Sequence, residues 1–293
     1  MQTFDPNAIK PNFLKAIEAT QSAINARSVS AKLAMLKDVE ATMNALTGQD
    51  DLKIKTSRTS MLTFNRIINE FLFNKGEYSN IEFANLEDFE SKLTSQDKEI
   101  LIALLLDASY TTLPKRATVC PECGETTEYE AKVADLFSNP ETKIPVWDND
   151  APVYEKVFTK TFFDGVLTAN IKMPTEAKKN KVYNTMTFDK VRKNIIDKGQ
   201  VLDSTDTILM FIDSLVVSYK KESYELKDIV TEIRPYLDNA ALEVHEAINN
   251  FVNELFDKYT LDFKCAVKCS NCGHEFNESV SPESEFFRKA FSI

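Results

Sequence analysis

The sequence predicts an α+β protein that is mainly helical, with small β-hairpin elements and a four-cysteine zinc ribbon that joins two pseudo-repeated halves. Three observations support this class. Apolar residues recur every three or four positions in several long segments, as on the buried face of a helix. Shorter segments alternate apolar and polar residues, as strands do. Two Cys-x-x-Cys-Gly motifs occur, and a strand-like segment follows each of them.

Composition excludes several classes of function. The 293 residues are 43% hydrophobic and 27% charged, which is typical of a globular chain. The 35 basic and 45 acidic residues give a net charge of -10, which disfavours nucleic-acid and anionic-membrane partners. Only 6 glycines and 2 histidines are present, so phosphate-binding loops and histidine catalysis have few residues to use. The sequence MQTFDPNAIK is not a signal peptide, and the apolar run 100–106 is too short to span a membrane.

The first part of the chain is predicted to form four helices. Pro11 opens the first, and Gly48 ends the second. The third ends at Lys75 and Gly76, and the fourth begins near Thr94 and Ser95. Each apolar stripe is expected to face the core, with docking onto a partner chain as the alternative. The stripes comprise Phe13 and Ile17; Leu36, Val39, Met43 and Leu46; Phe64, Ile67, Ile68, Phe71 and Leu72; and Leu101, Leu104, Leu105 and Ala108.

The rest of the chain mixes strands and helices. We expect a strand over 128–133, a linker over 139–152, a hairpin over 158–173, a helix over 208–219, a short helix at 229–233 that stops before Pro235, and a helix over 239–256. His245 lies on the inner face of that last helix and is expected to be a packing residue. The basic stretch 172–198 is either a solvated helix face or a docking patch for an acidic partner.

We predict that the chain divides into three regions: 1–85, an N-terminal helical region; 86–145, a helix with the first Cys motif; and 146–293, a β-hairpin and helices that end in the second Cys motif.

The two cysteine motifs are the strongest chemical signal. They comprise Cys120, Cys123 and Gly124, and Cys269, Cys272 and Gly273. Two cysteines separated by two residues can bind one tetrahedral metal ion, and a structural zinc site uses four ligands. The glycine after the second cysteine allows a positive φ, which a tight turn requires. We therefore predict that Cys120, Cys123, Cys269 and Cys272 bind one structural zinc ion.

The cysteines also have alternative interpretations. A thioredoxin-like redox site uses the same spacing, but it requires a helix directly after the motif, and here a strand is expected. Cys265 is predicted to be a buried thiol rather than a fifth ligand. His274 is either a hydrogen-bond donor to a thiolate or an exposed residue.

The surroundings of the two motifs suggest an internal repeat. Cys120 and Cys269 lie 149 positions apart. Each is preceded by a predicted helix and followed by an acidic strand-like segment, and a pair of residues that includes phenylalanine ends each half; we call this pair the aromatic stop. The stops are Leu136 and Phe137 in the first half, and Phe286 and Phe287 in the second. Such a duplication predicts two halves joined by one metal ion.

The order of elements around the second motif resembles a known family. It comprises a strand ending at 171–175, the helix 208–219, a short helical piece 226–237, the sequence Cys-Ser-Asn-Cys-Gly-His-Glu-Phe at 269–276, and the pair Phe286 and Phe287. This arrangement over 158–291 is similar to the baseplate hub and hub-assembly proteins of T-even-like tailed bacteriophages. Residues 86–137 are similar to the first-motif half of that family. The resemblance implies a structural or assembly role without catalysis, in a virion tail baseplate built in the host cytoplasm.

Three classes of function compete. Partners of the first class, a phage tail connector, would be other tail or baseplate proteins, bound through Phe286, Phe287, Phe291 and the N-terminal helices. Self-packing of these phenylalanines is the alternative. The second class is a nucleic-acid-binding zinc ribbon, which is disfavoured because 115–137 carries three basic and five acidic residues. The third class is an enzyme, and the sequence has no phosphate loop, GxSxG or HExxH motif.

Overall fold

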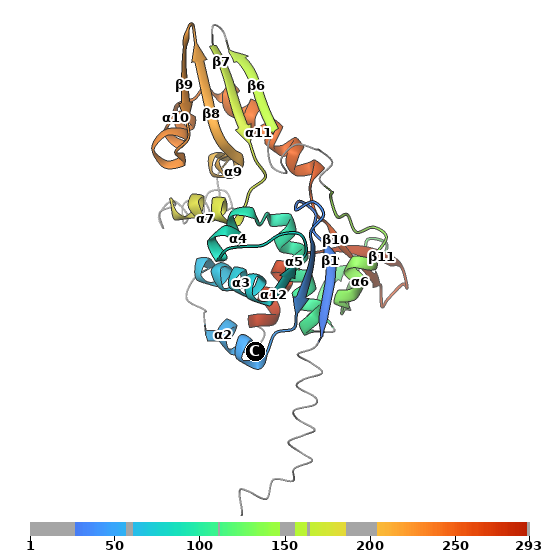
Figure 1. Cartoon of the computed structure of the whole chain (residues 1–293). Coiled ribbons are helices and arrows are strands. Elements are labelled where there is room, and N and C mark those ends of the chain that lie inside the picture. The colour runs from blue at the N-terminus through green and yellow to red at the C-terminus, as the bar shows by residue number, and fades with distance from the viewer. Residues whose placement is uncertain are drawn as a thin grey trace, which may run out of the picture.

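The computed structural model describes residues 27–56, 61–110, 112–146, 156–162, 165–185 and 204–291. Figure 1 shows a body that holds both ends of this described chain, and a lobe that projects from it. The fold is α+β, with several small antiparallel sheets. Among the described residues, no helix is both long and apolar enough to cross a membrane.

The body is built around a three-stranded antiparallel sheet and a buried helix. The sheet has the order β1 (Ser28–Lys32), β2 (Glu40–Asn44) and β3 (Gly76–Tyr78). Helices α2 (Gly48–Thr56) and α3 (Met61–Lys75) lie between β2 and β3 in the sequence, and α4 (Leu86–Lys92) follows β3. Helix α5 (Ser95–Ser109) packs against β1 and β2, and all its residues from 100 to 108 are buried. A helix that is apolar on every side needs this central position.

Two β-hairpins carry the cysteine motifs. The first pairs β4 (Arg116–Val119) with β5 (Thr126–Tyr129) and leads into α6 (Val133–Ser138). The second pairs β10 (Phe263–Lys268) with β11 (Glu275–Val280) and leads into α12 (Pro282–Phe291). Both therefore have the order strand, motif, strand, helix. Whether this shared order reflects a duplication of the whole halves stays a prediction.

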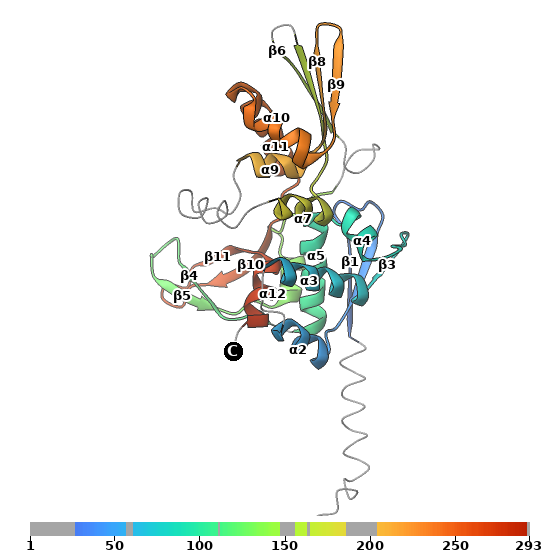
Figure 2. The ribbon, with the colours of Figure 1, turned by 90° about the vertical axis from the view of Figure 1, so that its left-hand side faces the viewer.

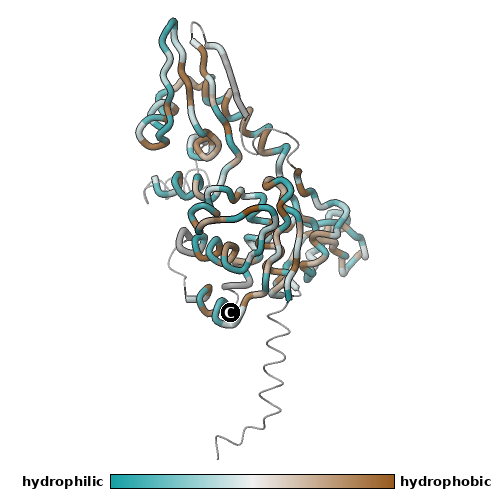
Figure 3. Tube along the Cα trace, in the orientation of Figure 1, coloured by the Kyte–Doolittle hydropathy of each residue, from teal (hydrophilic) through white to brown (hydrophobic). Residues whose placement is uncertain are grey.

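The lobe is inserted between the two hairpins. Its antiparallel sheet has the order β6 (Lys156–Phe162), β7 (Gly165–Ile171), β8 (Ile212–Tyr219) and β9 (Glu222–Leu226). Helices α9 (Ser204–Phe211), α10 (Arg234–Asn239) and α11 (Leu242–Lys258) lie on one face of this sheet, and α7 (Glu176–Asn184) lies between the lobe and the body (Figure 2). The strands of the lobe carry hydrophobic stretches, whereas the β8–β9 tip is hydrophilic (Figure 3).

A short backbone pairing closes the neck of the lobe. The N–H of Lys143 donates to the carbonyl of Asp262 over 2.9 Å, and the N–H of Asp262 donates back over 3.0 Å. The side chain of Thr142 accepts from the N–H of Lys264 over 3.0 Å. The chain thus leaves and re-enters the body at one place, which brings the two hairpins together.

Several sequence predictions are confirmed. The helix that ends at Lys75, the helix capped by Thr94 and the hairpin around 158–173 are present, although the turn at 163–164 lies outside the described residues. The helix predicted over 239–256 is α11, and His245 Nε2 contacts the carbonyl of Leu237, as a packing residue would. The first predicted helix, with Phe13 and Ile17, lies outside the described part of the chain.

Four local predictions are wrong. Residues 40–44 form strand β2 rather than a helix. Met43 was assigned to a helical apolar stripe, but an apolar residue at this position fits the buried face of a strand equally well. The predicted helix 208–219 is helical only to Phe211 and then becomes the central strand β8. The short helix predicted at 229–233 is present as the π-helical turn Ile229–Ile233, but the helical path does not stop before Pro235, because this proline lies in the first turn of α10. The strand expected over 128–133 ends at Tyr129. The region 1–85 is accordingly not purely helical.

The C-terminal aromatic residues pack on the chain itself. Phe286 is 2% exposed and belongs to the hydrophobic core, and Phe287 packs against that core. Helix α12, which carries both, contacts α5. The prediction that Phe286 is a partner anchor is therefore wrong, because its surface is already covered. The side chain of Phe291 lies outside what the structure describes.

Asp97 on α5 fixes the connection between β1 and β2. Its Oδ1 accepts the N–H groups of Ala34 and Met35 over 2.7 and 2.9 Å. Its Oδ2 accepts the N–H of Leu36 over 3.1 Å. All of these groups are buried, so one carboxylate satisfies three donors that water cannot reach.

We expect Asp97→Ala to lower the free energy of unfolding by at least about 3 kcal/mol, because each buried donor left unpaired costs ~1–3 kcal/mol. Urea unfolding followed by circular dichroism measures this loss. Asp107→Ala, on the same helix, is the matched control, since among the described residues the Asp107 carboxylate forms an ion pair only with the half-exposed Arg27, at 3.5 Å. Equal losses in both variants would contradict the role given to Asp97.

Candidate metal centre

Each cysteine motif forms the same tight loop. In the first, the N–H of Gly124 donates to the carbonyl of Cys120 over 2.9 Å, and Gly124 has φ 73°. In the second, the N–H of Gly273 donates to the carbonyl of Cys269 over 3.0 Å, and Gly273 has φ 76°. A side chain at either glycine would be strained at this φ. The glycine requirement inferred from the sequence is thus explained by the backbone.

The two loops bring four sulfur atoms together. Cys120 Sγ lies 3.7 Å from Cys272 Sγ, and Cys123 Sγ lies 3.7 Å from Cys269 Sγ. All four sulfurs lie within 4.8 Å of one another. Four thiolates at ~2.3 Å from one tetrahedral ion would be ~3.8 Å apart. The observed distances fit that geometry and are too long for a disulfide, and all four cysteines are free.

Polar contacts between the hairpins hold this geometry. Thr127 Oγ1 donates to Ser270 Oγ over 3.0 Å and accepts the N–H of Ser270 over 2.9 Å. Asn139 Nδ2 donates to Asn277 Oδ1 over 2.8 Å, and the rings of Phe137 and Phe263 meet edge to face at 5.2 Å. Thr127, Ser270, Asn139 and Asn277 were not singled out from the sequence, because nothing in their local pattern marks them. They position the sulfurs independently of any ion.

The backbone of the second loop favours a thiolate at its first cysteine. The N–H groups of Cys272 and Asn271 stabilise the charged form, so the pKa of Cys269 is lowered to about 6. The N–H of His274 lowers the pKa of Cys272, but burial and the three neighbouring thiols outweigh it and raise this pKa to about 12. A second negative charge is therefore costly in this cluster without a cation, and a divalent metal ion supplies that charge.

The other two candidates do not join the cluster. Cys265 is buried, and burial raises the pKa of its thiol, as predicted for a structural residue. The ring of His274 stacks on Phe276 with 6.0 Å between centroids. His274 contributes through its backbone instead, because its carbonyl accepts the N–H of Cys269 over 2.8 Å.

Comparison with known families identifies the class of this protein. Residues 30–288 match the family described as T4 bacteriophage base plate protein. The match covers most of the chain, and the protein therefore belongs to this family of phage baseplate structural components. This places it in the tail of the virion, where it interacts with other tail proteins. Neither the search of curated proteins nor the search of solved structures returned a significant match.

Metal analysis of the purified, reduced protein should give one zinc ion per chain, because the four sulfurs form one site. Cys265→Ser should keep that ion, whereas Cys269→Ser should lose it. Two ions per chain, or none in protein with intact thiols, would contradict a shared site.

Removing one ligand should loosen both hairpins. In Cys272→Ser we expect faster hydrogen exchange over 112–138 as well as over 260–291, because the ion would join segments that are distant in sequence. Mass spectrometry of exchange, with Cys265→Ser as the matched variant, measures this. An effect confined to the second hairpin would contradict a link across the chain.

Proposed function

We propose that this protein is a zinc-stapled connector of the baseplate hub, in which one structural ion joins the hairpins on both sides of an inserted lobe. The observation that supports the proposal most directly is the convergence of the four cysteine sulfurs within 4.8 Å. A tetrathiolate site is closed, with no free position for a substrate, and is typical of structural zinc. The proposed role is therefore architectural and involves no turnover of a substrate.

The position of the cluster explains what the ion would do. The inserted lobe occupies the chain between the two motifs, and it meets the body at the Lys143–Asp262 pairing and at α7. Two backbone hydrogen bonds are a weak closure for a neck of this kind. A metal ion that ties β4–β5 to β10–β11 would fix the strands on both sides of the neck. The lobe would then project from a rigid base.

Charge favours protein partners over nucleic acid. Residues 115–137 carry a net charge of -2, and residues 258–278 are neutral with three charges of each sign. A surface of this kind cannot neutralise a row of phosphates. The partners we propose are other hub or tail proteins. The N-terminal helices, named from the sequence as a docking surface, remain part of this proposal, and the first of them lies outside the described residues.

The proposal is tested by co-assembly with the other baseplate proteins of the same phage. Cys272→Ser should fail to enter baseplates at the temperature where the wild-type protein enters, and Cys265→Ser should enter normally. Sedimentation of assembled particles and immunoblotting measure incorporation. Normal incorporation of a variant shown to lack zinc would refute the stapling role. Loss of zinc binding in the Cys265→Ser variant would show that the ligand set is wrong.

A further inference from the structure

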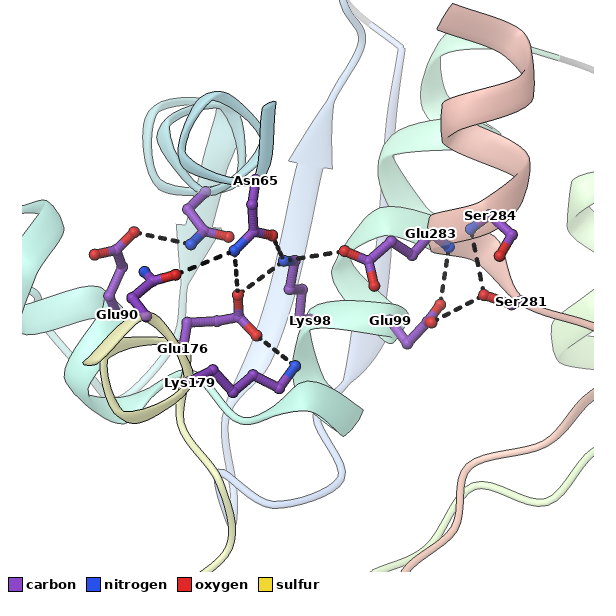
Figure 4. A network of polar contacts seen from close by, with 11 residues as sticks. Asn65, Glu90, Lys98, Glu99, Glu176, Lys179, Ser281, Glu283 and Ser284 are labelled. Atoms are coloured by element: carbon purple, nitrogen blue, oxygen red, sulfur yellow. Dashed lines mark hydrogen bonds and ion pairs between the residues drawn. The ribbon is translucent and has the colours of Figure 1, made fainter. Parts of the chain in front are cut away.

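A second buried polar cluster lies where α7 meets the body (Figure 4), and the metal centre does not use it. The Lys98 side chain on α5 is 3% exposed, and the Glu176 side chain on α7 is fully buried. They form an ion pair at 2.8 Å. A buried lysine amine is rare, and it can act as a nucleophile toward a neighbouring side chain.

Asn65 on α3 completes the cluster. Lys98 Nζ contacts Asn65 Oδ1, so the amine lies directly against the side-chain amide. Glu176 Oε2 accepts from Lys98 Nζ over 2.8 Å and from Asn65 Nδ2 over 3.1 Å. One carboxylate oxygen thus touches both the amine and the amide nitrogen, which is the position that a proton shuttle between them requires.

We propose that Lys98 and Asn65 form an intramolecular amide bond, with Glu176 as the catalytic residue. The lone pair of Lys98 Nζ would form a bond to Asn65 Cγ, and the Cγ–Nδ2 bond would break. Glu176 Oε2 first takes one proton from the Lys98 ammonium, and after the attack it delivers this proton to Nδ2, which leaves as ammonia. The second proton that Nζ loses passes through the same carboxylate to the released ammonia, which departs as ammonium. The reaction needs no oxidant or cofactor, because an amine and an amide give a substituted amide and ammonia.

The neighbouring residues hold the three groups in place. Lys179 Nζ donates to Glu176 Oε1 over 2.9 Å, which leaves Oε2 directed at the reacting pair. The N–H of Glu176 donates to the carbonyl of Leu93 over 2.8 Å and fixes the start of α7 on the body. Such preorganisation is the main requirement for a reaction between two groups of one chain. The product would tie α3 to α5 across 33 positions of sequence.

The charges around Lys98 control how fast the bond forms. Burial alone would lower the pKa of Lys98, but the carboxylates of Glu176 and Glu283 outweigh it and raise that pKa. Burial would likewise raise the pKa of Glu176, but Lys179 and Lys98 lower it to about 2. The pair is therefore ionic at rest, and the proton must first move from Nζ to Oε2. Glu283 on α12, 3.2 Å from Nζ, opposes that transfer because it stabilises the ammonium form.

The test is the intact mass of the full-length protein under denaturing conditions. We expect a deficit of one ammonia and, after digestion, a branched peptide that joins residues 65 and 98. Asn65→Ala and Lys98→Met should restore the full mass. Lys53→Met is the matched control, because Lys53 forms an ordinary surface ion pair with Glu70 and should leave the deficit unchanged. A full mass in the wild-type protein, or an ammonia loss without the branched peptide, would overturn the proposal.

Two further variants separate catalysis from structural stabilisation. Glu176→Gln should slow bond formation by on the order of a hundredfold, since it removes the proton shuttle. Glu283→Gln should accelerate it, because it removes a charge that keeps Lys98 protonated. A purely structural ion cluster would show no such opposite effects on the rate. Circular dichroism verifies that each variant is folded, and equal rates in the two variants would overturn the catalytic assignment.

Discussion

The meeting of two hairpins that are distant in sequence is the constraint on which the rest of the structure depends. Each hairpin is small, and a lone two-stranded hairpin is marginally stable in water. Pairing between Lys143 and Asp262 and contacts such as Thr127 with Ser270 bring them together. Only then do four sulfurs converge, because each motif supplies two. The lobe between the hairpins can form its own sheet without disturbing this base, since its chain enters and leaves at one neck.

Helix α5 provides the second organising element, and its polar residues matter as much as its apolar ones. Its apolar sides bury leucines and isoleucines against the body sheet, α3, α6 and α12. Its first turn carries Asp97, Lys98 and Glu99, and each contacts a different part of the chain. Asp97 binds the β1–β2 connection, Lys98 binds α7, and Glu99 accepts the N–H of Glu283 at the start of α12 over 2.9 Å. Three consecutive residues thus position three separate elements.

The sequence allowed the cysteine set to be predicted because the chemistry is local: two ligands, a turn and a glycine lie within five residues. The helices with strong apolar stripes, such as α3 and α11, were predictable for the same reason. Strands β2 and β8 were not, because Met43 and Leu215 fit a helical stripe as well as a strand face. Lys98, Asn65 and Glu176 could not be grouped either. They lie on three helices, and their contact is a product of tertiary packing alone.

The two clusters would cross-link a body that has only small sheets in its described part. A metal ion at the sulfur cluster would join the first hairpin to the second, and an amide bond between Lys98 and Asn65 would join α3 to α5. The two cross-links act on different pairs of elements. Helix α12 contacts both clusters: its Glu285 lies 3.3 Å from Arg116, beside the first cysteine motif, and its Glu283 contacts Lys98. The base from which the lobe projects would then be held by two cross-links in addition to the backbone pairing at the neck.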